Sequence, residues 1–343
     1  MKILFVVPRF HTNQYQMVKT LQQKNHTVYF HVASIGLTED HSLVTPVKYS
    51  QSKASKLLES ISGNASVNHP NYFPNPIYYW RRFKELKPDI VIIRDPYKPF
   101  ALLAALCSSF AKSKIIFYTQ EALGGSGSRR KAVKQNLLVH FFKAAWMVPI
   151  MENRNGDLKK LKHQYYVPLP VPCNTWQNIE TAAADDEPKI LMIGKYHQAR
   201  KNHLLFINAI KALKDKYRFK VTMVGECVRQ QQLEKFEHIK TTIQQMELSD
   251  IIMLKQNIPY HKMTALYTSH QIFVLPAINE QYGISVTEAL GFGLPVICTD
   301  TCGARFNIVN GENGFVVKSN SLTSLTTALE MVLSNDAKRQ DMS

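Results

Sequence analysis

Short apolar runs alternate with amphipathic helical stretches along most of this chain. The pattern predicts strands over residues 3–7, 26–33, 89–94, 114–119, 189–193, 220–224, 251–254, 272–275 and 296–298. It predicts helices over residues 14–24, 77–87, 100–111, 131–148, 202–216, 260–268, 283–291 and 321–333, and a charged helix that ends near residue 248. Strands that alternate with helices in this way indicate an α/β protein with doubly wound parallel sheets.

The chain is long enough for two domains. Its 343 residues are 45% hydrophobic, which supplies a core for each domain. Prolines stiffen the segment 167–174, so we place the boundary there and predict domains 1–172 and 173–343. Residues 36–76 are polar and are expected to form loops with one or two short helices.

No stretch of the sequence predicts a membrane span or a signal peptide. Apolar runs stay below the ~18 residues that a spanning helix needs. The first residues, MKILFVVPRF, predict a strand rather than a signal peptide. The five cysteines are scattered, and Cys298 and Cys302 lack a second pair of ligands, so neither zinc nor a disulfide framework is predicted. We therefore expect a cytoplasmic protein with reduced thiols.

The net charge of +16 is unevenly divided along the chain. Residues 1–172 contain 24 Lys and Arg against 9 Asp and Glu, a net charge of +15, whereas residues 173–343 contain 18 against 17, a net charge of +1. The asymmetry predicts an anionic partner for the first half: a lipid surface, a phosphorylated carrier, an acidic glycan or nucleic acid. Nucleic acid is disfavoured, because no recognition motif is present and the basic residues interleave with buried strands.

The predicted helix over residues 131–148 has two interpretations. Basic residues lie near its start and apolar residues follow, at Arg129, Arg130, Lys131, Lys134, Leu137, Leu138, Phe141, Phe142 and Trp146. This combination is typical of a helix that lies on an anionic membrane. An ordinary core helix with a solvated basic start accounts for the same residues. The glycines at 124–127 do not follow a strand at phosphate-loop spacing, so no nucleotide site is predicted there.

Two glutamates stand out in the second half. The strand over residues 272–275 ends at Pro276, a polar loop contains Glu280, and Glu288 lies in a helix that begins near Gly283. Ligands of open α/β sheets bind at the carboxyl ends of strands, and a helix start suits a phosphate. Carboxylates beside such a site should contact neutral hydroxyls, which predicts a nucleotide-sugar site. A capping box formed by Ser285 and Glu288 is a purely structural alternative.

The spacing Glu280-x7-Glu288 is followed by G-L-P-V-I-C-T-D and N-G-E-N-G-F-V-V. Together these residues resemble the signature of family 4 retaining glycosyltransferases, specifically over residues 189–318. The resemblance implies the GT-B fold, in which two Rossmann-like domains face each other across a cleft. It implies transfer of a sugar from a nucleoside-diphosphate sugar, a UDP-sugar more readily than a GDP-sugar, with retention at the anomeric carbon and without a metal. The family further implies bacterial-type surface polysaccharide or lipopolysaccharide assembly.

The resemblance also assigns roles to residues of this chain. Glu280 would position the donor sugar and Glu288 would bind the ribose hydroxyls. The backbone amides expected at the distal phosphate are those of Gly283, Ile284 and Ser285. After Gly194, the family's cations for the leaving diphosphate correspond to Lys195 and to either Arg200 or Lys201. A solvated basic loop is the structural alternative for these cations.

The first half departs from the family pattern. The loop after the first strand carries Arg9 and His11 but lacks the Gly-Gly pair of many relatives. Gln120 and Glu121 stand where many relatives have a histidine. We take these four residues as acceptor-side candidates without assigned roles. The chain also ends soon after the helix over residues 321–333, where the family usually has a last helix that returns to the first domain.

The resulting hypothesis is a glycosyltransferase with its donor site in the second domain. Its acceptor would be an anionic glycan, glycolipid or lipid-linked sugar, and it would contact the inner face of the cytoplasmic membrane peripherally. The alternatives are a catalytically idle GT-B partner subunit and, less favoured, a nucleic-acid-binding protein. A glycan phosphorylase would need a lysine site for pyridoxal phosphate, which the sequence does not reveal.

Overall fold

The computed structural model describes residues 1–36, 39–62, 71–121, 129–151, 163–172, 187–228 and 230–343. The chain divides into two compact units, Met1–Pro170 and Val171–Ser343. The division falls within the proline-containing segment where a domain boundary was predicted. The glycines at 124–127 and Cys173 lie outside the described residues.

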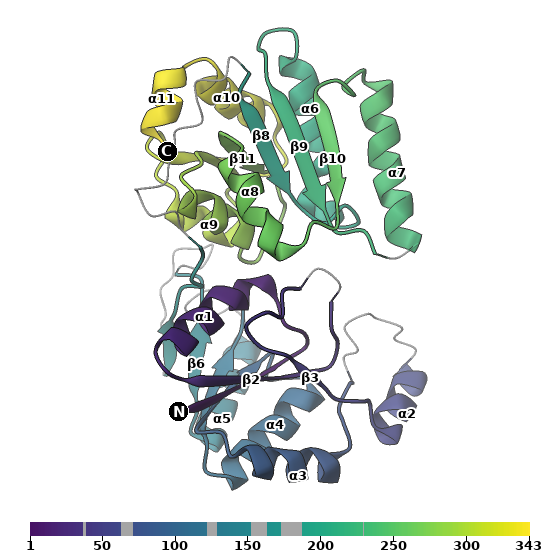
Figure 1. Ribbon diagram of the computed structural model, residues 1–343, viewed down its shortest axis with the longest axis vertical. Helices are drawn as coiled ribbons and strands as arrows, with labels where there is room; N and C mark the ends of the chain where they lie inside the picture. Colours follow the sequence, from purple (N-terminus) through teal and green to yellow (C-terminus); the bar gives the residue numbers. More distant parts are fainter. Residues whose placement is uncertain (37–38, 63–70, 122–128, 152–162, 173–186, 229) are drawn as a thin grey trace. The chain divides into compact units, whose positions relative to one another are not determined.

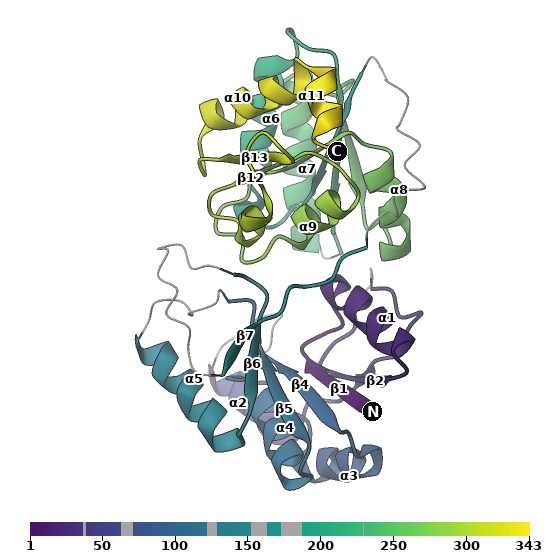
Figure 2. The ribbon, with the colours of Figure 1, turned by 90° about the vertical axis from the view of Figure 1, so that its left-hand side faces the viewer.

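The N-terminal unit is built on a parallel sheet of seven strands, in the order β3-β2-β1-β4-β5-β6-β7 (Figures 1 and 2). The strands are β1 (Lys2–Val7), β2 (Thr27–Val32), β3 (Val47–Lys48), β4 (Ile90–Arg94), β5 (Lys114–Tyr118), β6 (Ala145–Val148) and β7 (Gln164–Tyr166). The helices are η1 (Thr12–Gln14), α1 (Tyr15–Gln23), α2 (Lys53–Ser62), α3 (Pro76–Leu86), α4 (Pro99–Phe110) and α5 (Arg129–Phe142). Strand β2 lies on one side of β1, and β4 lies on its other side. The strand order therefore reverses between β1 and β4.

Both faces of this sheet are covered, which explains its continuous apolar runs. Figures 1 and 2 show α1 on one face and α3, α4 and α5 on the other. On the α1 face, the rings of Phe5 and Phe30 stack with centroids 4.6 Å apart. On the other face, Tyr79 of α3 and Phe100 of α4 pack in the same cluster as Trp146 of β6.

The C-terminal unit contains a parallel sheet of six strands, in the order β10-β9-β8-β11-β12-β13. The strands are β8 (Lys189–Ile193), β9 (Lys220–Gly225), β10 (Ile252–Gln256), β11 (Ile272–Leu275), β12 (Val296–Thr299) and β13 (Gly314–Val317). The helices are η3 (Ala199–Lys201), α6 (His203–Leu213), α7 (Gln230–Gln245), η4 (Tyr260–Lys262), α8 (Met263–Thr268), α9 (Ile284–Gly291), η5 (Gly303–Asn307), α10 (Leu322–Leu333) and α11 (Asp336–Asp341). Here the order reverses between β8 and β11.

Alternate residues of the central strands serve two different cores. Ile272 and Val274 of β11 join one cluster with α6, α7 and α10. Phe273 and Leu275 of the same strand join another cluster with α8 and α9. All four side chains are buried, so the strand shows no polar alternation. The prediction of doubly wound parallel sheets is confirmed.

The predicted helix over residues 131–148 is wrong at its carboxyl end. Helix α5 ends at Phe142, the chain turns at Lys143 with φ 49°, and Ala145–Val148 form strand β6. Trp146 is fully buried on β6, and its indole nitrogen donates to the Thr119 hydroxyl at 2.9 Å. A short apolar run fits a strand and a buried helix equally well, so periodicity alone could not separate them. The short edge strands β3, β7 and β13 were not predicted.

Among the described residues, no helix combines the length and apolar character needed to cross a membrane.

Candidate functional site

The donor-site candidates gather at one edge of the C-terminal sheet. Strands β8 and β11 pair in parallel, with Ile190 opposite Ile272. The segments that follow them, residues 194–202 and 276–283, therefore leave the sheet side by side at the carboxyl edge. This is the point where the strand order reverses, and ligands of open α/β sheets bind at such points.

Gly194 makes room for a lysine in the first of these segments. A Cβ atom at Gly194 would lie 3.2 Å from Cγ of Lys201, so a larger residue would displace that side chain. The Gly194 carbonyl accepts a hydrogen bond from His203 Nε2 at 3.1 Å. Asn202 adopts the left-handed conformation, φ 57°, and turns the chain from η3 into α6. Lys201 is thus held in place and is only 9% exposed.

Glu280 and two cations form the centre of the site. The Glu280 carboxylate accepts from Lys201 Nζ at 2.7 Å and from Arg200 Nη1. It is 8% exposed. The main chain fixes both segments: the Ile278 amide donates to the Arg200 carbonyl at 2.7 Å, and the Gly303 amide donates to the Glu280 carbonyl at 3.0 Å. The structure brings both Arg200 and Lys201, the two candidates for the second cation, into contact with Glu280.

Lys195 has a different partner. It forms an ion pair with Glu226, which follows β9, the neighbour of β8 on the side away from β11. Sequence analysis did not single out Glu226. A signal was available, since Glu226 directly follows a predicted strand and so had to lie at the same sheet edge. Lys195 remains 34% exposed at its side chain, which leaves it accessible to a ligand.

Helix α9 begins beside Glu280. Gly283 is its N-cap, with φ +84°, and a Cβ atom there would lie 2.7 Å from Sγ of Cys302. No side chain caps the helix in the described part of the chain. The amides of Ile284 and Ser285, like those of any first helical turn, have no acceptor within the helix. They can therefore receive an anion, and the helix dipole favours one.

The capping-box interpretation of Glu288 is wrong. Ser285 lies inside α9 rather than at its N-cap, and the Glu288 side chain turns to two tyrosines instead. Its carboxylate accepts from the Tyr267 hydroxyl at 2.7 Å and from the Tyr260 hydroxyl at 3.4 Å. Burial raises the pKa of Glu288 to about 7, against a smaller opposite effect of the two tyrosine hydroxyls. Neither tyrosine was singled out from the sequence, because both belong to a segment distant from the motif.

Over the described ranges, no group of three or more His, Cys, Asp or Glu side chains is arranged to hold a metal ion. Cys298 and Cys302 are both buried free thiols. A hydrogen bond between these two thiols raises the pKa of Cys298 and lowers that of Cys302.

The acceptor-side candidates occupy two loops of the N-terminal unit. Arg9 forms an ion pair with the buried Glu39 at 3.2 Å, and the His11 amide donates to Gln14 Oε1 at 3.1 Å. Gln120 and Glu121 follow β5, and Glu121 Oε1 lies 3.6 Å from Lys131 Nζ. Strand β4 separates β1 from β5 in the sheet. The loop with Arg9 and His11 and the loop with Gln120 and Glu121 therefore follow strands that are not neighbours.

The C-terminal unit is similar in sequence to known proteins. Residues 175–343 match the family model described as Glycosyl transferases group 1. A mannosyltransferase of Caenorhabditis elegans, "GDP-Man:Man(3)GlcNAc(2)-PP-Dol alpha-1,2-mannosyltransferase", is 26% identical over 184 residues, which are 50% of this chain and 39% of that protein. The Staphylococcus aureus capsular polysaccharide biosynthesis glycosyltransferase CapM is 23% identical over 124 residues, 36% of this chain and 31% of that protein. The matches thus span less than half the length of these curated relatives.

Solved structures resemble the whole chain. A glycosyltransferase of Rickettsia africae has a TM-score of 0.71 at 18% identity, covering 99% of this chain and 91% of that one. HepE of Anabaena, in complex with UDP and glucose, has a TM-score of 0.72 at 12% identity, covering 100% and 92%. WaaG, a glycosyltransferase involved in lipopolysaccharide biosynthesis, has a TM-score of 0.65 at 13% identity, covering 99% and 92%. The expectation of a GT-B fold is confirmed.

Proposed function

We propose that this chain, whose C-terminal unit carries a group 1 glycosyl transferase domain, is a retaining glycosyltransferase of family 4. It moves a sugar from a nucleoside-diphosphate sugar to a glycan or glycolipid acceptor, in the assembly of a surface polysaccharide or lipopolysaccharide. One observation carries the proposal. A buried glutamate, Glu280, is held by Arg200 and Lys201 at the carboxyl edge of the sheet, and an uncapped helix start and a second buried glutamate follow it directly.

The same contacts suggest how the donor is bound. Arg200 and Lys201 neutralise the diphosphate, and the first amides of α9 bind its distal phosphate. Glu280 contacts hydroxyls of the transferred sugar, and Glu288 contacts those of the ribose. Before the donor enters, the Glu280 carboxylate keeps the two cations in position. Lys195 lies earlier in the same segment, residues 194–202, and adds a third cation.

Charge that develops on the leaving diphosphate is the target of this arrangement. As the glycosidic bond breaks, the departing phosphate oxygen gains negative charge. Cations and amides that already surround it stabilise the transition state more than the ground state. Three side-chain cations and a helix start supply this stabilisation, so we propose that transfer does not depend on a metal ion.

The acceptor belongs to the basic N-terminal unit in this proposal. Arg9, His11, Gln120 and Glu121 lie at the carboxyl edge of its sheet, where open α/β sheets bind ligands. The net charge of +15 over residues 1–172 favours an anionic glycan, glycolipid or lipid-linked acceptor.

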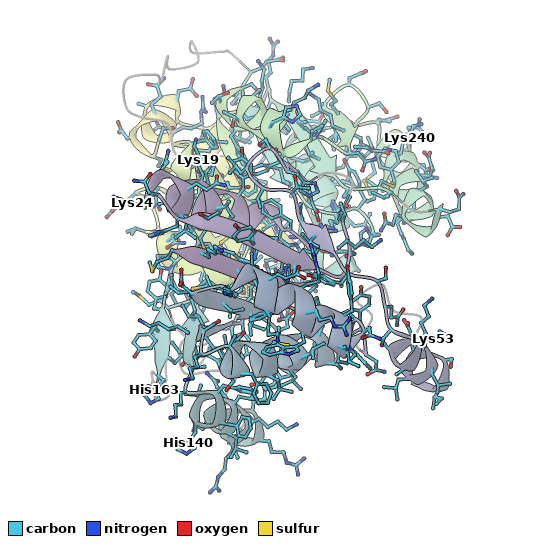
Figure 3. All side chains as sticks on the ribbon, turned by 60° about the horizontal axis from the view of Figure 1, so that its bottom comes forward. Lys19, Lys24, Lys53, His140, His163 and Lys240 are labelled. Carbon is cyan, nitrogen blue, oxygen red and sulfur yellow. The ribbon has the colours of Figure 1, made fainter. Side chains whose placement is uncertain are left out.

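A peripheral contact with an anionic membrane is also proposed, through helix α5. Its buried side supports the sheet through Gln135, Val139 and Phe142. Its outer side exposes Val133, Leu137 and Phe141, the last at 71%. These three residues, spaced by four, form one apolar stripe on the helix. Figure 3 shows other cations of this unit, Lys19, Lys24 and Lys53, on its periphery.

The proposal is tested by donor binding and transfer in the full chain. Thermal unfolding is measured with UDP, GDP, ADP and CMP and their sugars, with EDTA and then with Mg²⁺. A ligand that binds only the folded state raises its stability by mass action. We expect one nucleoside diphosphate and its sugar to raise Tm regardless of metal, a UDP-sugar first, and a transfer product with retained anomeric configuration. No stabilisation by any of them would refute an active enzyme and favour an idle partner subunit.

A further inference from the structure

A pocket lies in the N-terminal unit, where its strand order reverses between β1 and β4. The pocket contains about 350 Å³ of space, part of it open to solvent. Its walls are the carboxyl end of β1, the end of β4 and the first turn of α4. Only two of its lining residues are charged, Arg94 and Lys98, and both are cations.

Arg94 is buried without its usual complement of acceptors. Its side chain is 12% exposed. Its Nε and Nη1 atoms are buried and have no hydrogen-bond partner in the described part of the chain. The nearest carboxylate, that of Asp95, lies 3.9 Å from Nε, beyond hydrogen-bond distance. The guanidinium lies over the ring of Tyr118, 5.7 Å from its centroid. A buried guanidinium lacking acceptors is costly, and an oxyanion that accepts from it would remove that cost.

Lys98 and the start of α4 add to the positive potential. Lys98 is the N-cap of α4 and has no side-chain hydrogen bond at the cap, and the first turn contains no acidic residue. The helix is twelve residues long and begins with Pro99. The amides of Phe100 and Ala101 lie in its first turn, where amides have no acceptor within the helix. Both residues line the pocket, so the positive end of the helix dipole faces it.

Among the residues that the structure describes, Asp95 is the carboxylate that pairs with both cations, at 3.6 Å from Lys98 Nζ and 3.9 Å from Arg94 Nε. It therefore balances only one of the two positive charges. Its backbone is held in the left-handed region, φ 54°, by hydrogen bonds from its amide to the Tyr118 carbonyl and from the Lys98 amide to its own carbonyl. A non-glycine residue in this conformation is uncommon and is typical of functional loops.

We propose that this pocket binds an oxyanion, a phosphate or a carboxylate, through Arg94, Lys98 and the first turn of α4. Resting on the proposed function, we further propose that the oxyanion is part of the acceptor sugar. Tyr72 and Phe100 line the same pocket and offer aromatic surface to the apolar face of a sugar ring. The acceptor class is then an acidic or phosphorylated glycan rather than a neutral one.

The test uses the full chain, with thermal unfolding and hydrogen exchange as readouts. Inorganic phosphate, glucose 6-phosphate, glucuronate and glucose are compared at equal ionic strength. The variants are Arg94→Gln, Lys98→Gln and Arg94→Lys. Lys114→Gln is the matched control, since Lys114 is an exposed cation at the amino end of β5, the opposite edge of the same sheet. Circular dichroism verifies that each variant is folded.

We expect the two anionic sugars to raise Tm in a saturable way and to slow exchange at the start of α4, with glucose without effect. Arg94→Gln should weaken this binding at least about tenfold, as expected for loss of a charge-assisted pair of hydrogen bonds. Lys98→Gln should weaken it less, Arg94→Lys should retain part of it, and Lys114→Gln should leave it unchanged. Should Arg94→Gln not fold, the Lys98→Gln and Arg94→Lys variants decide the question.

If the anionic sugars raise the Tm of the wild type and of Arg94→Gln equally, the proposed role of the pocket in binding an oxyanion is refuted. Equal binding of inorganic phosphate and glucose 6-phosphate would overturn its acceptor role, because the sugar would then contribute nothing. These readouts need no catalysis. If the chain binds anionic sugars through Arg94 but transfers no sugar, the proposed function is refuted and the oxyanion pocket stands. If the chain transfers sugar but its binding of anionic sugars does not depend on Arg94, the proposed function stands and the oxyanion pocket is refuted.

Discussion

At the scale of single residues, the two glutamates of the motif differ in what surrounds them. Glu280 accepts from the cations Arg200 and Lys201. Glu288 is buried, and in the described part of the chain its hydrogen-bond donors are neutral, the hydroxyls of Tyr260 and Tyr267. Burial without a cation disfavours a charge, which is why the pKa of Glu288 is raised.

This difference predicts a pH dependence of stability. The pKa of Glu288 rises from 4.5 to about 7 on folding, so the folded chain holds this proton more tightly than the unfolded chain. The free energy of unfolding should therefore fall as pH rises from about 4.5 to 7, by at most about 3 kcal/mol from this group. Urea unfolding of the wild type and of Glu288→Gln, at several pH values, measures it. The difference in free energy of unfolding between the wild type and Glu288→Gln should change across this pH range. The difference between the wild type and Glu312→Gln, a substitution at an exposed residue, should stay constant.

For Glu280→Gln we expect turnover to fall by about 10² or more, while the Kd of the nucleoside diphosphate stays within about threefold. The amide keeps the shape but no longer neutralises Lys201 and Arg200, so stability should drop by about 1–3 kcal/mol. Steady-state rates and calorimetric binding measure the two effects separately. Glu312→Gln is again the control, and a near-normal rate for Glu280→Gln would remove Glu280 from the proposed role.

At the scale of elements, the helices of the N-terminal unit combine clear local signals with faces that the sheet buries. Helix α3 begins where Asn75 accepts from the amides of Ile77 and Tyr78, both at 3.0 Å, with Pro76 at its first position. Asn at the N-cap and Pro at the first position are strong start signals. The buried side of α3 then packs Tyr79 and Phe83 into the core.

Because of this cap, Asn75→Ala should lower the free energy of unfolding by about 1 kcal/mol. The variant leaves two helix amides without an acceptor. Chemical unfolding monitored by circular dichroism measures the change. Asn75→Asp, which restores a side-chain acceptor at the same position, should recover most of the lost stability; failure to recover would show that the cap is not the cause.

Helix α5 predicts salt-sensitive membrane binding. Arg130 and Lys134 are exposed beside the apolar stripe of Val133, Leu137 and Phe141. Removing both charges should weaken binding to phosphatidylserine vesicles about 30-fold, at ~1 kcal/mol for each cation. Added salt should release the wild type, because the Debye length shortens. Sedimentation with vesicles measures both effects.

The matched control for this experiment is Lys240→Gln, an exposed lysine on α7 of the other unit (Figure 3). It should bind vesicles like the wild type. Binding that neither salt nor the α5 charges influence would argue against a membrane role for this helix.

At the scale of the whole molecule, each unit has its own sheet and its own buried core. Both sheets reverse their strand order once, and in both sheets a pair of cations with a proposed binding role lies at the carboxyl edge of that point: Arg200 and Lys201 in one, Arg94 and Lys98 in the other. In our proposals the cations at these two points bind different ligands. Those of the C-terminal unit bind the donor diphosphate, and those of the N-terminal unit bind an acidic acceptor.

Ligands should therefore protect the two units separately in hydrogen exchange. A UDP-sugar is expected to slow exchange in residues 194–202 and at the start of α9, and glucose 6-phosphate at the start of α4. Exchange measured by mass spectrometry on the full chain, with each ligand alone and with both, resolves these segments. Protection of the same segments by both ligands would contradict separate sites.

The sequence by itself determined the fold class and indicated which residues gather at the carboxyl edge of the C-terminal sheet. Continuous apolar runs separated by helices specify buried parallel strands, since both faces of such strands are covered. Glu280 and the cations after Gly194 could be found because they lie in loops that follow predicted strands, and Glu288 because it lies in the helix after such a loop; chain order then places these segments at the carboxyl edge.

Only the tertiary structure decided which of these residues meet and what else surrounds them. The pairing of Glu280 with both Arg200 and Lys201 depends on the register of β8 with β11 across about 80 residues of sequence. The tyrosines around Glu288, the strand at Trp146 and the buried guanidinium of Arg94 likewise depend on contacts between distant segments. Local periodicity carries no information about such contacts, because they form only when the sheets assemble.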